Sequence, residues 1–265
     1  MTDAAVRAAV ADHPLWYHTL ELRPGVVTPG WFDLRGVVDE LPWPDVAGKR
    51  CLDIATYDGH LAFELERRGA AEVVATDIVD HHLWDHLPRE RHGAIQYLEA
   101  AAGKKGHGFE IARDALGSEV DRRFINVYDL DADEIGTFDV VTCGSLLLHL
   151  RDPLRALERI RSVCTGTFLS VEAIDPVASL LHRKRPMMWL NGDDAQWLVP
   201  NAAAHVHMLH VAGFDVHRTT RPKPEAYGPA HSSVRTTPRE LLQRIVAGGR
   251  GVPVQAVLAR PARLG

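Results

Sequence analysis

Three aspartates lie in or just after short apolar runs, at a spacing that suggests a ligand site. The run at residues 51–55, CLDIA, carries Asp53, and the run at residues 71–78, AEVVATDI, carries Asp77 near its end. Asp58 lies in the short turn after the first run. If both runs are strands of one parallel sheet, a ligand binds beyond their carboxyl ends. An acid there can accept both hydroxyls of a ribose, and the turn offers backbone N–H groups to a carboxylate.

The turn itself, Ala55–Gly59, does not suit a dinucleotide. It reads Ala-Thr-Tyr-Asp-Gly, whereas a pyrophosphate needs the bare backbone of a Gly-x-Gly-x-x-Gly turn. A ligand with an amino acid end fits better, because Asp53 or Asp58 can bind its ammonium group and backbone amides can bind its carboxylate. S-adenosylmethionine (SAM) is such a ligand, and its ribose would then bind Asp77.

The elements that must position these acids alternate between strand-like and helix-like segments. The strand candidates are residues 50–55, 71–78, 120–130, 137–144, 166–174, 214–220 and 252–260. Segments with helical periodicity are residues 59–69, 107–117, 153–164, 201–213 and 239–246. Such alternation is typical of βαβ units. The sequence therefore predicts an α/β fold, with a seven-stranded and mostly parallel Rossmann-like sheet.

The chain divides into a leading segment and a main domain. Residues 1–47 combine a helical start, a turn-rich piece and the helix-like run GVVDEL, and the Pro-rich run LPWPDVAG ends them. We expect these residues to form a cap or lid, and residues 48–265 to form the ligand-binding domain. An insert at about 176–200, after the fifth strand, would cover the cleft together with the cap. A Pro/Gly-rich connection is expected before the helix at 239–246.

Composition favours a globular protein that acts on a small molecule. The net charge is −5, with 30 Lys and Arg against 35 Asp and Glu, whereas nucleic-acid-binding domains are usually strongly basic. A local basic patch could still bind nucleic acid. Three cysteines without a Cys-x-x-Cys pair suit a reducing compartment. With neither a secretory leader nor a membrane-spanning stretch in view, we expect a cytoplasmic protein without a membrane partner; the oligomeric state is left open.

Histidines and short basic runs raise two further possibilities. The chain has 15 His, and His82 and His86 are four residues apart beside Asp85, but His-Glu-x-x-His is missing and a zinc site needs three or four convergent ligands. We therefore expect no metal. The runs Lys104–Lys105 and Arg183–Arg185 are expected to be solvated surface rather than a phosphate track.

The motifs resemble a known family. CLDIATYDGH followed by VVATDI resembles motifs I and II of the class I SAM-dependent methyltransferases, and FDVVTCGSLLLHLRDPLRALERI resembles the fourth strand and following helix of that fold. More narrowly, TPGWFD, LLLHLRDP and AQWLVPNAAAHVHMLHVAGF resemble the enzymes that transfer a carboxymethyl group to the wobble uridine of tRNA. The resemblance covers most of residues 15–260, and it implies that the last strand of the sheet is reversed.

The resemblance implies a set of cofactor residues, with S-adenosylhomocysteine (SAH) as the product of SAM. The methionine end would lie against motif I, the ribose on Asp77, the adenine at the residues after the third strand, and the sulfonium beside the end of the fourth strand. The implied residues are Asp53, Ala55, Thr56, Tyr57, Asp58, Gly59, Asp77, Ile78, Val127, Tyr128, Cys143 and Gly144.

Departures from the family pattern bear on the transferred group. Ala55 replaces the usual glycine of motif I and narrows the room for the methionine end. The tRNA enzymes hold the extra carboxylate of carboxy-SAM with a Tyr and an Arg, where this chain has Leu148 and Gln255. Their absence favours ordinary SAM and plain methyl transfer.

Catalytic and substrate residues are less sharply indicated. His149 could act as a general base, because an unperturbed imidazole titrates near neutral pH, and Glu172 could face the substrate; either could instead be structural. Candidate substrate contacts, which could equally be core residues, are Trp16, Tyr17, His18, Trp31, Ser145, Trp189 and Trp197.

Three hypotheses about function follow from these features. The leading one is SAM-dependent methyl transfer to a small molecule, at a hydroxyl group. The second is a tRNA wobble-uridine (carboxy)methyltransferase, which requires a basic face that reaches the cleft. The third is a SAM-binding protein without catalytic activity.

Overall fold

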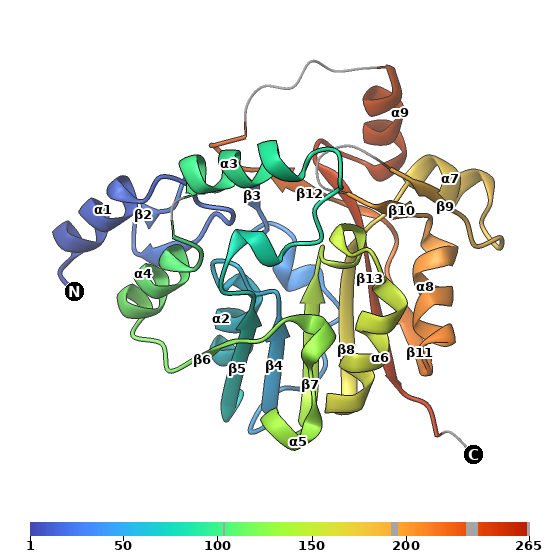
Figure 1. Cartoon of the computed structure of the whole chain (residues 1–265), viewed down its shortest axis with the longest axis horizontal. Coiled ribbons are helices and arrows are strands. Elements are labelled where there is room, and N and C mark those ends of the chain that lie inside the picture. The colour runs from blue at the N-terminus through green and yellow to red at the C-terminus, as the bar shows by residue number, and fades with distance from the viewer. Residues whose placement is uncertain (103, 192–195, 232–237, 264–265) are drawn as a thin grey trace.

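A computed structural model shows one mixed sheet at the centre of the protein (Figure 1). The structure describes residues 1–102, 104–191, 196–231 and 238–263. Five parallel strands lie in the order β6-β5-β4-β7-β8. They are β4 (Arg50–Ile54), β5 (Glu72–Asp77), β6 (Asp121–Phe124), β7 (Phe138–Gly144) and β8 (Cys164–Ala173). Two strands follow β8 in the sheet. β13 (Val252–Pro261) pairs antiparallel with β8 and is the reversed strand, while β11 (Phe214–Thr219) pairs antiparallel with β13 and so runs in the direction of β8. The predicted α/β sheet with its reversed last strand is confirmed.

Helices cover both faces of the sheet, and each face has its own apolar core. On one face lie α1 (Asp3–Asp12), α2 (His60–Arg67) and α4 (His107–Leu116). On the other lie α5 (Ala132–Ile135), α6 (Pro153–Val163) and α8 (Ala202–Val211). The central strands are apolar because they are buried on both sides, as parallel strands usually are. This layering leaves the carboxyl ends of β4, β5, β7 and β8 together at one edge, at the top of Figure 1.

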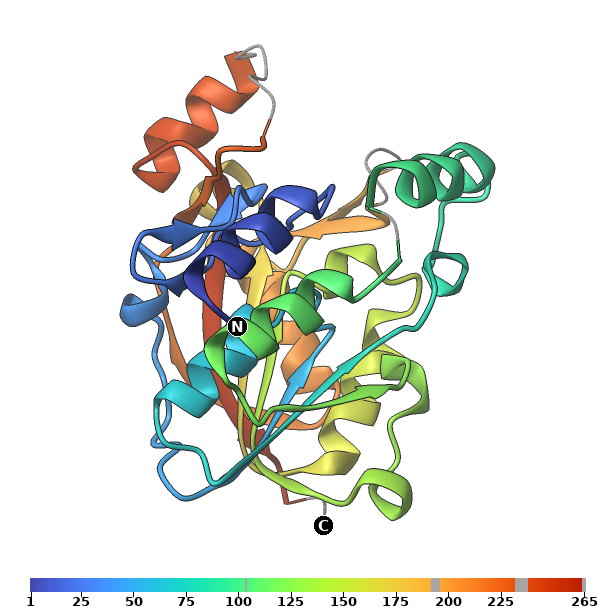
Figure 2. The same cartoon turned by 90° about the vertical axis from the view of Figure 1, so that its left-hand side faces the viewer.

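The leading segment packs against the same edge and also joins the sheet. It contains α1, the hairpin of β1 (Glu21–Arg23) and β2 (Val26–Val27), then β3 (Phe32–Asp33) and a 3₁₀ turn, η1 (Val38–Glu40). Figure 2 shows α1 lying over α4, which it contacts. At its other end, β3 pairs with β12 (Lys223–Tyr227), and β12 pairs with β13. Two segments that are far apart in the sequence, β3 and β12, are thus brought together beside the site.

The remaining elements lie around the carboxyl edge of the sheet. The 3₁₀ turns η2 (His81–Leu83), η3 (Val127–Asp129) and η4 (Leu147–His149) follow β5, β6 and β7. The helix α3 (Arg91–Ala102) precedes α4, and α9 (Pro238–Ala247) precedes β13. The segment expected as an insert contains α7 (Pro176–Leu181), β9 (Met188–Leu190) and β10 (Leu198–Pro200), while residues 192–195 lie outside the described residues.

Two local expectations are wrong. The connection before α9 is not irregular throughout, because residues 223–227 form β12. Its sequence, KPEAY, lacks apolar alternation, and it is a strand because it pairs with β13 on one side and β3 on the other. The run GVVDEL forms only the single 3₁₀ turn η1, since the chain is already extended at Leu41, where the Pro-rich stretch begins.

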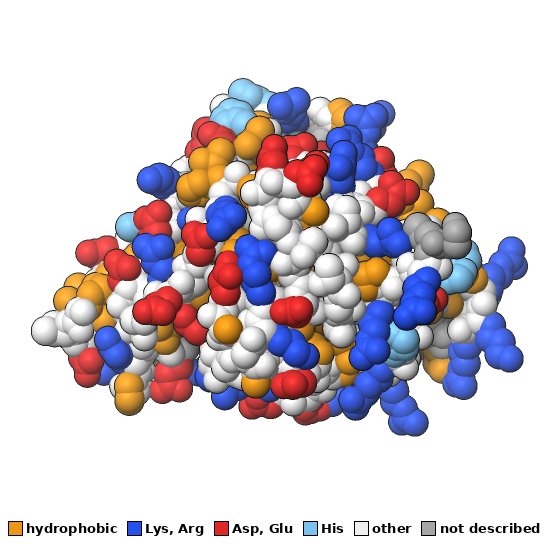
Figure 3. Space-filling view, turned by 90° about the horizontal axis from the view of Figure 1, so that it is seen from below, with side chains coloured by type: hydrophobic (Ala, Val, Ile, Leu, Met, Phe, Trp, Pro, Cys, Tyr) orange, Lys and Arg blue, Asp and Glu red, His pale blue; other side chains and the backbone are white. Residues whose placement is uncertain are grey.

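The opposite edge of the sheet carries a mixed surface. Figure 3, seen from below, shows acidic and basic side chains interspersed over most of that face, with Lys and Arg gathered toward its right-hand side. No helix among the described residues combines the length and apolar character that crossing a membrane requires.

The core beside α8 predicts the effect of a cavity-forming substitution. Phe168 on β8 is fully buried and its ring lies 5.2 Å from the ring of Phe214. We expect Phe168→Ala to lower the free energy of unfolding by about 3–5 kcal/mol, measured by urea denaturation. The matched control is Phe124→Ala, because Phe124 is 52% exposed. It should change stability by about 0.5 kcal/mol or less, and equal losses in both variants would contradict the packing described here.

Candidate functional site

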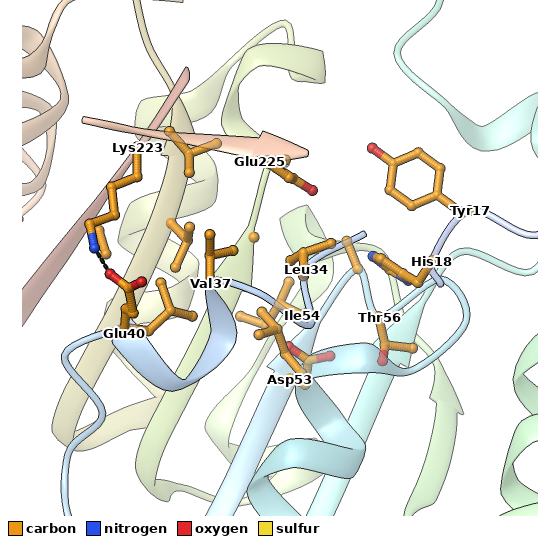
Figure 4. Close-up of a pocket in the computed structure, with 18 of the residues that line it drawn as sticks. Tyr17, His18, Leu34, Val37, Glu40, Asp53, Ile54, Thr56, Lys223 and Glu225 are labelled. Atoms are coloured by element: carbon orange, nitrogen blue, oxygen red, sulfur yellow. Dashed lines mark hydrogen bonds and ion pairs between the residues drawn. The ribbon is translucent and has the colours of Figure 1, made fainter. Parts of the chain in front are cut away.

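A cavity opens at the carboxyl edge of the sheet, between motif I, the leading segment and β12 (Figure 4). Most of the surface of its wall is apolar, although polar and charged residues also line it. The apolar lining residues include Leu34, Val37, Leu41, Ile54, Leu61, Val171, Val254 and Ala256. The polar or charged ones are Tyr17, His18, Glu40, Asp53, Thr56, Ser145, Thr220, Lys223 and Glu225. Ala55 and Gly144 complete the wall. An apolar pocket with a few convergent polar groups is typical of a small-molecule site.

Asp53 brings a buried carboxyl group to the cavity from β4. It is 2% exposed, and its Oδ1 accepts a hydrogen bond from Thr142 Oγ1 at 2.7 Å. Burial raises the pKa of Asp53 to about 7, with Asp77 contributing in the same direction. No lysine or arginine is paired with it among the described residues. A ligand ammonium placed here would stabilise the charged form of this carboxyl.

The turn after β4 has the strained backbone of a ligand-binding loop. Ala55 and Tyr57 have φ of 57° and 48°, and Gly59, with φ of 91°, begins α2. A Cβ on Gly59 would lie 2.5 Å from the Phe63 ring, so glycine is required there. Non-glycine residues at positive φ cost free energy and cluster at functional sites. Ala55 thus keeps a strained backbone, and its side chain lines the cavity where motif I usually has glycine.

Asp58 does not line the cavity with Asp53. Its Oδ2 accepts hydrogen bonds from the backbone N–H groups of Tyr17 and His18, at 2.6 and 3.0 Å. The carboxyl is 2% exposed, and burial raises its pKa to about 6, against the lowering effect of those two N–H donors. Of the two acids considered for an ammonium, the structure brings Asp53 to the cavity, while Asp58 holds the leading segment against motif I.

Asp77 ends β5 with both carboxylate oxygens engaged. Its Oδ1 accepts from the N–H of Ile78 at 2.8 Å, and its Oδ2 from the N–H of Tyr57 at 3.0 Å. Lys105 Nζ also donates to Oδ2, at 3.0 Å. The expectation that Lys105 is solvated surface is wrong, since the residue is only 7% exposed; Lys104 is exposed as expected.

The predicted adenine and sulfonium residues lie at the same edge with different degrees of access. Val127 is 6% exposed and belongs to the core, whereas Tyr128 is half-buried and its hydroxyl donates to Asp85 Oδ2 at 2.6 Å. Cys143 is fully buried in β7 and does not line the cavity, while Gly144 does. Burial, with Glu172 and Asp53 nearby, raises the pKa of the Cys143 thiol.

The two predicted bases do not line the cavity. Glu172 is 1% exposed, and its oxygens accept from the N–H groups of Leu146 at 3.4 Å and Leu147 at 3.0 Å. Burial raises the pKa of Glu172 to about 8. His149 is half-buried in η4, with its ring 6.1 Å from that of Trp84. Glu172 thus fixes the loop after β7 rather than facing the cavity.

Glu225 is the acid that faces the cavity, and the sequence did not single it out. It lies on β12, is 5% exposed, and its Oε2 is 3.4 Å from Ser145 Oγ, which donates to it. Figure 4 shows Glu225 and the Tyr17 hydroxyl pointing toward the same space from opposite sides. Burial raises the pKa of Glu225 to about 7, and burial together with Glu225 raises the pKa of Tyr17. Only the pairing of β12 with β13 and β3 places this acid here.

The aromatic candidates divide between the cavity wall and other places. Tyr17 and His18 line the cavity. Trp16 is a core residue at 1% exposure, and its indole N–H donates to Val10 O. Trp31 lies beside Tyr17, at 6.5 Å between rings, without lining the cavity. The other two lie in the segment after β8: Trp189 is 43% exposed, and the Trp197 indole donates to Asp85 O.

Several further residues bear on what the cavity can hold. Gln255 and Leu148 are each 5% exposed, and neither lines the cavity, although Val254 and Ala256 on either side of Gln255 do. Lys223 and Glu40 form an ion pair at the far end, drawn as a dashed line in Figure 4. Among the described residues, no group of three or more His, Cys, Asp and Glu is arranged to hold a metal ion.

The raised pKa of Glu172 predicts a pH dependence of stability. Between about pH 4.5 and pH 8, the folded state keeps a proton that the unfolded state has released, so stability falls as pH rises through this window. We expect Glu172→Gln to remove the contribution of this carboxyl. The loss of stability with rising pH should then be smaller by about 1 kcal/mol per pH unit. Urea denaturation at pH 5, 6, 7 and 8 measures it.

Glu158→Gln is the matched control for this series. Glu158 is exposed on α6, so its replacement should leave the slope of stability against pH as in the wild type. Identical slopes for Glu172→Gln and the control would contradict the burial of a proton-binding carboxyl at Glu172.

Comparisons with known proteins agree with this geometry. A family model described as a methyltransferase domain matches residues 33–219. A ubiquinone biosynthesis O-methyltransferase of Xanthomonas oryzae is 32% identical over 140 residues, covering 52% of this chain and 48% of the relative. The protein of the same name from Neisseria meningitidis is 30% identical over 109 residues, covering 41% and 37%. The chain therefore aligns with about half the length, or less, of these curated relatives.

Solved structures show the same architecture at low sequence identity. The N-terminal domain of EvdMO1 with SAH bound has a TM-score of 0.53 and 14% identity, covering 99% of this chain and 98% of that one. Magnesium protoporphyrin IX methyltransferase from Synechocystis, also with SAH bound, has a TM-score of 0.50 and 14% identity, covering 86% and 80%. The predicted class I architecture is confirmed, and the narrower likeness to tRNA-modifying enzymes stays a prediction. The chain belongs to the methyltransferase domain family and has the fold of the class I SAM-dependent methyltransferases.

Proposed function

We propose that this chain transfers the methyl group of SAM to a hydroxyl group of a small, largely apolar molecule bound in the cavity. The observation that carries the proposal is Glu225, a buried acid that faces an apolar cavity which Asp53 and the motif I turn also line. The cavity thus combines residues suited to a charged amino acid end with a group suited to removing a proton.

The residues present fit SAM as the cofactor. Asp53 offers a buried carboxyl for an ammonium group, and Asp77 offers its carboxylate at the end of β5 for ribose hydroxyls. The positive-φ turn at Ala55 and Tyr57 brings main chain rather than long side chains to the ligand. When bound, SAM would supply an activated methyl group on a sulfonium, so the protein has mainly to align the acceptor and exclude water.

The cavity wall favours an apolar acceptor. Leu34, Val37 and Leu41 of the leading segment face Val171, Val254 and Ala256 of the sheet across it. Burying such side chains against an apolar ligand contributes roughly 25 cal/mol per Å². A phenol or a similar hydroxylated ring would pack against this apolar wall and present one polar group. The sequence similarity to ubiquinone biosynthesis O-methyltransferases, whose name states an oxygen acceptor, supports this choice.

Glu225 is our candidate for the general base. A base works best when its pKa lies near the working pH, and burial raises the pKa of Glu225 to about 7. Ser145, which donates to its Oε2, fixes the direction of the carboxylate. Tyr17, whose pKa burial and Glu225 raise, stays protonated and can donate a hydrogen bond to the acceptor oxygen. This assignment replaces His149 and Glu172 as first candidates, since neither of them lines the cavity.

The cofactor assignment is tested by calorimetric titration with SAM and SAH. We expect Asp77→Ala to weaken SAM binding roughly tenfold or more, because a hydrogen bond to a charged group contributes about 1.5–3 kcal/mol. Asp121→Ala is the control, since Asp121 is exposed at the start of β6. Wild-type protein that binds neither SAM nor SAH would contradict the proposed cofactor.

The role of Glu225 is tested by the rate of SAH formation with phenol, catechol and 3,4-dihydroxybenzoate as trial acceptors. With whichever acceptor the wild type uses, we expect Glu225→Gln to lower kcat by about 10²- to 10⁴-fold and to leave the SAM dissociation constant within about twofold. The decline should be smaller above pH 9, where a phenol ionises without help. Glu158→Gln is again the control, and an unchanged kcat in Glu225→Gln would remove the proposed base.

A further inference from the structure

Lys105 takes up hydrogen-bonding capacity that a ribose on Asp77 would need. Its side chain is 3% exposed, that of Asp77 is 5% exposed, and their Nζ and Oδ2 atoms are 3.0 Å apart. A buried carboxylate needs a compensating charge or several donors. In the structure, Lys105 supplies that charge, and it does so from a short segment between α3 and α4 rather than from the sheet.

The acceptor capacity of Asp77 is nearly used up. A carboxylate has about four lone-pair positions on its two oxygens. Oδ2 already accepts from two donors, the N–H of Tyr57 and Nζ of Lys105, while Oδ1 accepts from the N–H of Ile78 alone. A ribose diol that bonds to both oxygens therefore needs one donor to leave Oδ2.

Lys105 is the donor that can leave. The Tyr57 N–H belongs to the positive-φ turn after β4, and its position is fixed by the chain on both sides. The Lys105 ammonium, by contrast, ends a flexible side chain and otherwise rests on aromatic faces, 4.3 Å from the centre of the Tyr57 ring and 5.7 Å from that of Trp84. It can move along these faces and remain over a ring.

We propose that Lys105 is a built-in competitor of the cofactor ribose for Asp77. Without ligand, Lys105 neutralises Asp77 and stabilises the site; on binding, the ribose hydroxyls replace the ammonium on Oδ2. This proposal rests on the proposed cofactor. Lys105 thereby lowers the affinity for the cofactor, because each molecule of SAM must first break a buried ion pair.

Replacement of the Lys105 ammonium by the ribose would also affect the acceptor cavity. The Tyr57 ring that carries the Lys105 ammonium lies 4.8 Å from the ring of Tyr17, which lines the cavity beside Glu225. Behind Lys105, the Gly106 carbonyl accepts from Arg122 at 3.1 Å, so the backbone of the segment is held from the sheet side. Cofactor binding thereby changes the packing on Tyr57 and its neighbour Tyr17.

The test compares Lys105→Met with Lys104→Met in the full chain. Lys104 is exposed, so its variant controls for loss of one positive charge nearby. We expect Lys105→Met to bind SAM and SAH roughly tenfold or more tightly than the wild type, whereas Lys104→Met binds them equally. Without ligand, Lys105→Met should melt at a lower temperature than the wild type, because Asp77 is left buried without its partner. SAM should raise the melting temperature of Lys105→Met by more than it raises that of the wild type.

Two further measurements sharpen this comparison. Lys105→Arg keeps the charge and the competition, so we expect no gain in affinity. Adenosine should show the gain in Lys105→Met, and 2′-deoxyadenosine, which lacks one of the two hydroxyls, should show less of it.

The outcomes separate this proposal from the proposed function. Wild-type binding of SAM with equal or weaker binding by Lys105→Met would overturn the role of Lys105 and leave the cofactor assignment intact. Absence of binding by both proteins would overturn both. Binding by Lys105→Met alone would support the competition in its strongest form.

Discussion

The burial of several carboxyl groups at one edge of the sheet is the constraint on which the rest of the site depends. These groups include Asp53, Asp58, Asp77, Glu172 and Glu225, and each of these five is at most 5% exposed. Taking a charge out of water costs far more than a surface ion pair returns, so each group needs donors, a counter-charge or a proton. The ways in which the chain meets this need determine where its loops and its leading segment lie.

Different elements meet the need at different acids. Two backbone N–H groups of the leading segment bind Asp58, and this contact holds Tyr17 and His18 against motif I. The loop after β7 binds Glu172, and Lys105 neutralises Asp77. Asp53 and Glu225, which face the cavity, accept hydrogen bonds from the hydroxyls of Thr142 and Ser145, and neither has a lysine or arginine partner among the described residues. The two acids that lack a counter-charge in the cavity wall are therefore available to ligands.

The sequence predicted the sheet and its order of elements well, and it predicted some of the residues that line the cavity. Most strands of the Rossmann-like sheet are apolar runs between helices, although β6, with the sequence DRRF, is not. Asp53 and Asp77 follow from their places on β4 and β5. Glu225 could not be predicted, because KPEAY has no strand pattern of its own and takes its place through pairing with β13 and β3. Lys105 was missed for a similar reason: beside Lys104 it reads as surface, and only the fold brings it to Asp77.

The most direct test of this account is a crystal structure of the protein with SAH. We expect the ribose hydroxyls on Asp77 and the amino group of the homocysteine end against Asp53. The sulfur should be open to the cavity that Tyr17, Ser145 and Glu225 line, and Lys105 should have moved from Asp77. SAH bound elsewhere, or bound with its sulfur turned away from that cavity, would contradict it.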